Sequence, residues 1–153
     1  MQLNIRVDDL SDPRIAEFLE DHLKDMRATS PPKSIHALDL NGLKKPEITF
    51  WTAWHESMLM GCGALKRLDA EHAELKSMRT SPQHRRQGLG KSILNFILDE
   101  ARRRGYRRMS LETGSMAFFE PARTLYLNHG FVFCEPFADY KLDPNSVFMT
   151  RNL

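Results

Sequence analysis

The chain has 153 residues, 41% hydrophobic and 27% charged, a balance typical of one globular domain spanning residues 1–153. Its 22 basic and 20 acidic residues give a net charge of +2, so no overall positive field favours nucleic acid. No apolar run approaches the ~20 residues that cross a bilayer, and the N-terminus lacks a signal-peptide pattern. We therefore expect a cytoplasmic protein with no membrane or nucleic-acid partner.

The first half of the chain alternates between strand and helix patterns. Residues 3–7 alternate weakly, as a strand does, and Pro13 opens a helical pattern whose apolar residues share one face through Met26. Residues 34–43 predict a second, short helix. Three consecutive strands rich in β-branched, aromatic and other apolar residues are predicted next, the first two as a hairpin: 47–55, 58–68 and 73–80.

The second half predicts one long crossover followed by short elements. An amphipathic helix runs from Leu89 to Ala101 and ends near Gly105. Four shorter elements follow, namely a strand at 108–112, a helix at 121–128, and strands at 131–134 and 147–151. This order predicts an α+β fold with a mixed, mostly antiparallel central sheet, a βαβ crossover, and three to four helices around it.

Residues 85–92, RRQGLGKS, share features with two nucleotide-binding loops. The ending Gly90-Lys91-Ser92 is that of a P-loop, but a P-loop requires glycine five positions earlier, where Arg85 stands. A dinucleotide-binding Gly-x-Gly-x-x-Gly pattern also fails, because Ile93 stands where its third glycine belongs. Both nucleotide-binding interpretations are therefore rejected.

The pattern that survives is Arg-x-x-Gly-x-Gly at the start of a helix. Gly88 and Gly90 have no Cβ, so main-chain N–H groups can approach a diphosphate closely. The first N–H groups of a helix lack internal partners, and its dipole favours an anion there. Arg85, Arg86 and Lys91 add positive charge. A plain turn before a glycine-opened helix is the alternative.

This strand, loop and amphipathic helix together resemble the central motif of the GNAT (Gcn5-related) N-acetyltransferases. Downstream, ARTLYLNHGF (residues 122–131) resembles the second signature of the family, Ala-x-x-Leu-Tyr-x-x-x-Gly-Phe. Segments such as SPPKSIHAL and LETGSM also resemble the bacterial YsnE-type group within the family. The resemblance implies the GNAT fold and an acetyl-CoA-dependent acyltransferase.

The resemblance also implies which residues hold acetyl-CoA, the co-substrate. The main chain of Ser77, Met78 and Arg79 would pair with the pantetheine arm, and an N–H there could stabilise the oxyanion. The pyrophosphate would lie on the loop and the helix start, formed by Arg85, Arg86, Gln87, Gly88, Leu89, Gly90 and Lys91. No metal is expected, because Cys62 and Cys134 are too few and too far apart and are most simply buried thiols.

Two residues are the catalytic candidates. Tyr126 occupies the tyrosine position of the family, which implies a general acid that protonates the departing thiolate; a phenol with an ordinary pKa of about 10 is protonated at pH 7. Glu74 lies eleven positions before Arg85, the offset of the catalytic glutamate in the Gcn5 branch, and is the candidate base. A packing role for Tyr126 and an ion pair for Glu74 are the alternatives, and Glu112 and His36 are alternative bases.

The acceptor side is less readable from the sequence. Five residues could line an acceptor pocket: Trp51, Trp54, Arg79, Ser115 and Arg123. Core packing is the alternative for the tryptophans, and internal ion pairs are the alternative for the arginines. Phe119 stands three positions before Ala122, where the family often has Asn, so no CoA contact of the kind that Asn makes is expected there.

These patterns predict acetyl transfer to a primary amine of a small molecule or amino acid, by direct attack in a ternary complex. An acetyl-cysteine intermediate is not expected, because both cysteines lie outside the motifs. One alternative is a protein or peptide N-acetyltransferase, with an acidic groove supplied by Glu135, Asp139 and Asp143. Another is a non-catalytic CoA-binding module. Dimers are common in the family, so a homodimer is also among the expectations.

Overall fold

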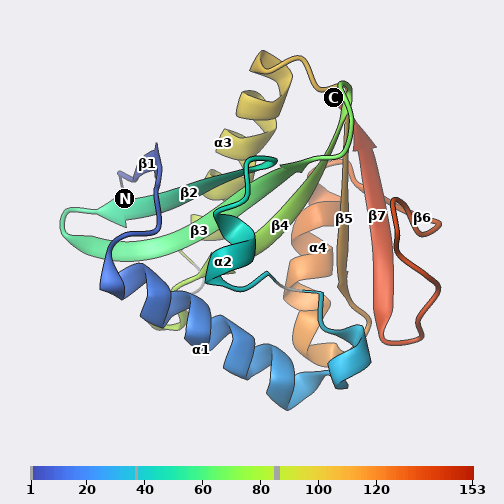
Figure 1. Cartoon of the computed structure of the whole chain (residues 1–153), viewed down its shortest axis with the longest axis horizontal. Helices are drawn as coiled ribbons and strands as arrows, with labels where there is room; N and C mark the ends of the chain where they lie inside the picture. The colour runs from blue at the N-terminus through green and yellow to red at the C-terminus, as the bar shows by residue number, and fades with distance from the viewer. Residues whose placement is uncertain (1, 37, 85–86) are drawn as a thin grey trace.

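The computed structural model describes residues 2–36, 38–84 and 87–153 (Figure 1). In these residues, seven strands form one sheet in the order β1-β2-β3-β4-β5-β7-β6. The strands are β1 (Asn4–Val7), β2 (Ile48–His55), β3 (Met58–Arg67), β4 (His72–Thr80), β5 (Arg108–Gly114), β6 (Val132–Cys134) and β7 (Ser146–Asn152). The helices are α1 (Pro13–Thr29), α2 (Leu40–Leu43), α3 (Leu89–Arg103) and α4 (Glu120–Asn128).

The predicted α+β fold is confirmed. Neighbouring strands are antiparallel except for β4 and β5, which are parallel and are joined through α3 as the predicted βαβ crossover. The crossover helix α3 packs mainly over β3 and β4. Most elements lie within two residues of their predicted bounds.

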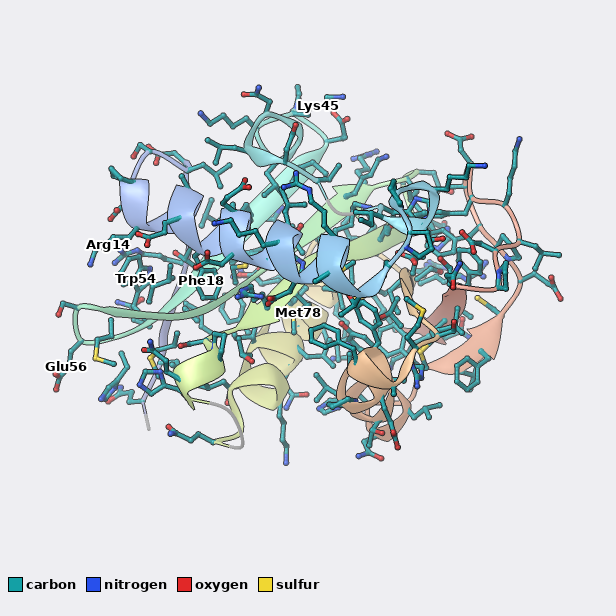
Figure 2. All side chains as sticks on the ribbon, turned by 90° about the horizontal axis from the view of Figure 1, so that it is seen from below. Arg14, Phe18, Lys45, Trp54, Glu56 and Met78 are labelled. Atoms are coloured by element: carbon teal, nitrogen blue, oxygen red, sulfur yellow. The ribbon has the colours of Figure 1, made fainter. Side chains whose placement is uncertain are left out.

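Helices cover both faces of the sheet, with α1 on one side of the strands and α3 and α4 on the other (Figure 2). A first core cluster packs the apolar face of α3, including Ile93 and Ile97, against Leu75 and Leu111 of the sheet. A second cluster packs Ile15 and Leu19 of α1 against the opposite face. The sheet is therefore covered on both sides, and β2 and β3 are buried along most of their length.

Helix α1 follows from its sequence signals. The Asp12 side chain accepts a hydrogen bond from the main-chain N–H of Arg14, and Pro13 occupies the first turn, where its missing N–H has no cost. Its apolar face includes Phe18, which Figure 2 shows between the helix and the sheet. The Arg14 guanidinium lies 4.7 Å from the centre of the Trp54 ring. Figure 2 shows the two residues near the same end of α1.

The predicted helix at residues 34–43 is wrong in extent. A single 3₁₀ turn covers Pro32–Ser34, and α2 begins only at Leu40. The Asp39 side chain accepts a hydrogen bond from the Gly42 N–H at 2.8 Å, which makes Asp39 the N-cap and starts the helix there. Residue 37 lies outside the described residues.

The two cysteines differ in their environments. Cys62 is a buried free thiol, as predicted. Cys134 is also free but lies on β6, at the edge of the sheet, and is only partly buried. The prediction that both thiols are buried is therefore wrong for Cys134, because an edge strand has a neighbour on one side only.

Candidate active site

The separation of β4 from β5 positions the site. The strands pair only at their first residues, through His72–Arg108, Ala73–Met109 and Glu74–Ser110. Beyond these pairs they diverge, and Figure 1 shows α4 between them. The main-chain groups along this side of β4 are therefore not used by β5 and are available to a ligand.

A β-bulge lies in β4 within the diverging segment. The register with β3 shifts between Cys62 and Ala64, so Ser77 and Met78 together face one residue, Gly63. Ser77 has a φ of 56°, in the left-handed region that costs a non-glycine residue about 1–2 kcal/mol. A bulge redirects the main chain locally. It therefore turns N–H groups of β4 away from regular pairing at the place where the sheet opens.

A cavity of about 640 Å³ occupies this opening and is lined by α1, β4, the start of α3, β5 and α4. Nine of the predicted site residues line it: Glu74, Ser77, Met78, Arg79, Gly88, Leu89, Gly90, Lys91 and Tyr126. Gln87 is exposed and is not part of the lining. Arg85 and Arg86 lie outside the described residues.

The start of α3 reaches the cavity with unpaired main-chain donors. Gly88 is the N-cap and has a φ of 75°, a left-handed conformation that favours glycine. A Cβ at Gly88 would meet no atom of the protein within 4 Å, so within the protein itself the need for glycine is conformational rather than steric. No described side chain caps this end, which leaves the first N–H groups of a 15-residue helix for an anion.

Tyr126 is placed on α4 against the core and beside the cavity. Its ring packs edge to face with Phe131 at 5.8 Å, and 7% of the residue is exposed. Burial, and secondarily the charge of Glu112, raise the pKa of Tyr126 above its ordinary value, so the phenol is protonated at neutral pH. The ring thus has the packing role that was the alternative prediction, while the residue also lines the cavity.

Glu74 forms a buried cluster with two residues that the sequence analysis did not single out. The Lys76 ammonium and the Tyr140 hydroxyl donate to the same Glu74 oxygen, Oε2, at 3.1 and 2.5 Å. Lys76 also donates to the Tyr140 oxygen at 3.0 Å. The Glu74 and Lys76 side chains are 3% and 9% exposed, and burial of an unpaired charge is costly. The ion pair between them compensates the negative charge of Glu74 and the positive charge of Lys76.

Glu112 is the second carboxylate of the cavity. It lies on β5, beyond the last pair with β4. Burial raises the pKa of Glu112 to about 7, although the positive charge of Lys76 acts in the opposite direction. A carboxylate with this pKa is present in both protonation states near neutral pH, as a general base requires.

The cavity passes from one face of the sheet to the other. Side chains alternate across a strand, and Leu75 and Leu111 pack with α3. Glu74 and Glu112, their neighbours in sequence, therefore project toward the α1 face. The start of α3 and Tyr126 belong to the opposite face, so one cavity brings an anion-binding helix end and a phenol to two carboxylates across the sheet.

Comparison with known proteins agrees with this geometry. Residues 15–131 match the model of the Acetyltransferase (GNAT) family. The chain belongs to the GNAT family. It is 58% identical to the uncharacterized N-acetyltransferase YsnE of Bacillus subtilis, over 99% of the chain and 100% of YsnE. It is 49% identical to the uncharacterized N-acetyltransferase YedL of Escherichia coli, over 97% of the chain and 94% of YedL. It is 37% identical to the IAA acetyltransferase of Azospirillum brasilense, over 92% of the chain and 89% of that protein.

Solved structures share the fold along the whole chain. A Klebsiella pneumoniae protein described as an acyl-CoA N-acyltransferase superposes with a TM-score of 0.80 at 27% identity, covering 99% of this chain and 98% of that one. The PaiA N-acetyltransferase of Thermoplasma acidophilum, solved with coenzyme A, superposes with a TM-score of 0.75 at 16% identity over both full chains. The latter likeness concerns the fold alone.

Family membership confirms several predictions. The chain is an acetyltransferase, its predicted co-substrate is acetyl-CoA, and the resemblance to the YsnE-type group is confirmed.

Within the described residues, no cluster of three His, Cys, Asp or Glu could hold a metal, and no helix is long and apolar enough to cross a membrane. The homodimer and the cytoplasmic location stay predictions.

The α1 face of this GNAT cavity contains residues that the sequence analysis missed. His22, Asp25 and Met26 of α1 line it, together with Lys76. His36 lines it as well, as expected for the alternative base, and its ring stands edge to face against Tyr140 at 4.9 Å. Met26 belongs to the predicted apolar face of α1, but helical periodicity does not distinguish a face in the core from a face that lines a cavity.

Both tryptophans belong to the core rather than to the cavity. Trp51 is 1% exposed and packs in the cluster beneath α3. Trp54 is 3% exposed in the α1 cluster, and its indole N–H donates to the Thr52 hydroxyl at 2.8 Å. The prediction that they line an acceptor pocket is therefore wrong, and the packing alternative is correct.

Ser115 and Arg123 also have structural partners. The Ser115 hydroxyl donates to the Pro144 carbonyl, and the Arg123 guanidinium donates to the carbonyls of Gly114 and Met116 at 2.7 and 2.9 Å. Neither residue lines the cavity, so their predicted acceptor role is wrong.

Phe119, at the position of the usual Asn, precedes α4 and is one of the residues that line the cavity. A Cβ at Gly114 would come within 2.1 Å of the Phe119 ring, so glycine at the end of β5 makes room for it. Ring packing thus takes the place of a polar side chain at the start of α4.

Proposed function

We propose that the protein transfers the acetyl group of acetyl-CoA to a primary amine of a small molecule or amino acid, by direct attack in a ternary complex. The observation that carries the proposal is the single cavity through the opening between β4 and β5. It gives the donor and the acceptor separate faces of the sheet and lets their reacting atoms meet in the middle.

The donor is placed by main-chain groups. The pyrophosphate of acetyl-CoA binds the N–H groups at the start of α3, where Gly88 and Gly90 allow close approach and Lys91 adds a positive charge. The pantetheine arm pairs with the main chain of Ser77–Arg79 as an added strand would. A thioester carbonyl held at the bulge receives a hydrogen bond from an N–H of β4, which stabilises the oxyanion.

The chemistry then needs one base and one acid. The neutral amine nitrogen attacks the carbonyl carbon and forms the C–N bond. The tetrahedral intermediate collapses with cleavage of the C–S bond, and the thiolate takes the proton of the Tyr126 hydroxyl. The proton lost by the attacking amine goes to a carboxylate on the α1 face. Solvent then takes this proton from the carboxylate and returns one to Tyr126.

Glu112 is the base that we favour, with Glu74 as the alternative. Lys76 and Tyr140 both donate to Oε2 of Glu74, so this oxygen is already engaged by two donors within the protein. Burial raises the pKa of Glu112 to about 7, so this carboxylate can accept and hold a proton at neutral pH. Glu74 would then fix the cluster that borders the amine.

The alternatives receive less support. An acidic groove for a peptide would need Asp143 free, but this carboxylate accepts a hydrogen bond from Ser34 at 2.6 Å. A non-catalytic CoA-binding module has no need for Tyr126 and two carboxylates around one cavity. Because one relative is named an IAA acetyltransferase, IAA is one of the compounds to test.

Two measurements test the proposal in sequence. Calorimetry should show binding of CoA and acetyl-CoA, and release of free thiol from acetyl-CoA should then rise with one or more members of a panel of amines, amino acids and IAA. A peptide array serves as the comparison. Absence of CoA binding would contradict the donor assignment, and acetylation of peptides without turnover of any small compound would favour the protein-directed alternative.

A further inference from the structure

Arg79 is a buried cation on the α1 face of the cavity. Its side chain is 9% exposed and lines the cavity from β4. One guanidinium nitrogen, Nη1, donates to Oδ2 of Asp25 on α1 at 2.8 Å. The guanidinium carbon lies 5.2 Å from the centre of the Phe18 ring, which fixes the plane of the group against the helix.

The Asp25 carboxylate satisfies only one end of this guanidinium. Nε is buried and has no hydrogen-bond partner, and no described residue bonds Nη2. Nε and Nη2 form one edge of the planar group, and their parallel N–H bonds match the two oxygens of a carboxylate. A buried charged donor without a partner is costly, so this edge indicates a ligand that completes it.

The surroundings of Arg79 leave its charge available to an anion. His22, one turn before Met26 on α1, is neutral at pH 7, because burial and then the charge of Arg79 lower the pKa of His22 to about 4. Asp25 is 40% exposed and therefore partly screened by solvent. The other buried cation of this face, Lys76, is already compensated by Glu74.

We propose that the acceptor carries a carboxylate, which the Nε–Nη2 edge of Arg79 binds. This inference rests on the proposed transfer to an amine and narrows its substrate class to amino acids and other amino-carboxylates. The reacting amine lies toward Glu112, and the carboxylate lies toward α1. Binding turns the free edge of the guanidinium toward the cavity while Asp25 keeps Nη1 in place.

The experiment compares acids with their amides. Thiol release is measured for a panel of L-amino acids and for the corresponding α-amides, which keep the amine and lose the negative charge. For the wild type we expect kcat/KM to favour the acid of the preferred pair by about 10- to 100-fold, the range for a charge-assisted hydrogen bond. Arg79→Gln should raise KM for the acid by a similar factor and change the amide little.

Two further variants make the result specific. Arg79→Lys keeps the charge without the two-donor edge and should recover only part of the preference. Arg27→Gln removes a charge on α1 whose partner is the exposed Glu20, and it should leave all rates unchanged. Circular dichroism and calorimetry with CoA establish that each variant folds; if Arg79→Gln does not, the wild-type preference and Arg79→Lys decide the question.

The outcomes separate this inference from the proposed function. Equal use of acids and amides by the wild type, or an equal loss for both in Arg79→Gln, overturns the carboxylate site and leaves amine acetylation intact. Turnover of neither set, while other small amines are acetylated, also overturns the inference alone. Turnover of no amine at all, while CoA still binds, contradicts the proposed function and the inference with it.

Discussion

The two sides of the cavity are built from different kinds of groups. On the side of α3 and α4, the donor meets main-chain N–H groups of the helix start and of β4, and the side chains there are mostly apolar. On the α1 side, charged side chains line the cavity in pairs, Glu74 with Lys76 and Arg79 with Asp25. Of the described carboxylates that line the cavity, Glu112 alone has no cationic hydrogen-bond partner.

This difference determines how each side responds to mutation. Main-chain contacts survive most side-chain replacements but depend on backbone conformation, which Gly88 and the bulge at Ser77 provide. Side-chain pairs depend on the identity of each member, because removing one member leaves a buried charge. A family can therefore keep one donor while the acceptor changes.

The largest effect should come from Tyr126, where the two sides meet. Tyr126→Phe keeps the ring that packs on Phe131 and removes only the proton donor, so kcat should fall about 1,000-fold. The Kd for CoA, measured by calorimetry, should stay within a few-fold of the wild type. If kcat is unchanged, the thiolate is protonated by another group, and Tyr126 has only the packing role.

The next effect tests the acceptor side through its pH dependence. Glu112 must be ionised to accept a proton, so kcat/KM should rise with pH and level off above about 7. Glu112→Gln should lower kcat/KM by about 100-fold and flatten this rise. Because the pKa of Tyr126 is raised, the acid form persists, and no fall from this residue is expected below pH 10.

Glu74→Gln is the matched variant, measured with the same acceptor so that titration of the amine affects all profiles equally. A smaller loss than in Glu112→Gln, with the pH-dependent rise retained, supports Glu112 as the base. A larger loss in Glu74→Gln, with loss of that rise, assigns the base to Glu74 instead.

The fold was predictable because its signals are local. Pro13 at the start of α1, the glycine before α3 and the β-branched and aromatic residues of β2 each act within a few residues. The second helix was misjudged because Asp39 could have been an interior residue or a cap, and its side-chain bond to the Gly42 N–H decides between them.

The two sides of the site differ in the same way: the donor side has a local sequence signal, and the acceptor side does not. The main-chain groups of the donor side lie close together in the sequence, within β4 and the start of α3, so their motif could be recognised there. The acceptor side joins α1, residue 36, β4, β5 and the loop at Tyr140, and contacts such as Tyr140 with Glu74 span 66 positions. No spacing rule predicts such contacts, because they depend on how the sheet brings its loops together.

The smallest effect should appear at Gly88, which tests whether the donor side depends on backbone conformation alone. A Cβ there would contact nothing, so Gly88→Ala should cost only the left-handed conformation, about 1 kcal/mol in the free energy of unfolding, measured by urea denaturation. Gly88→Asn should cost less, because asparagine tolerates this conformation better. Equal losses for both would mean that atoms of the side chain, rather than φ, disturb the start of α3.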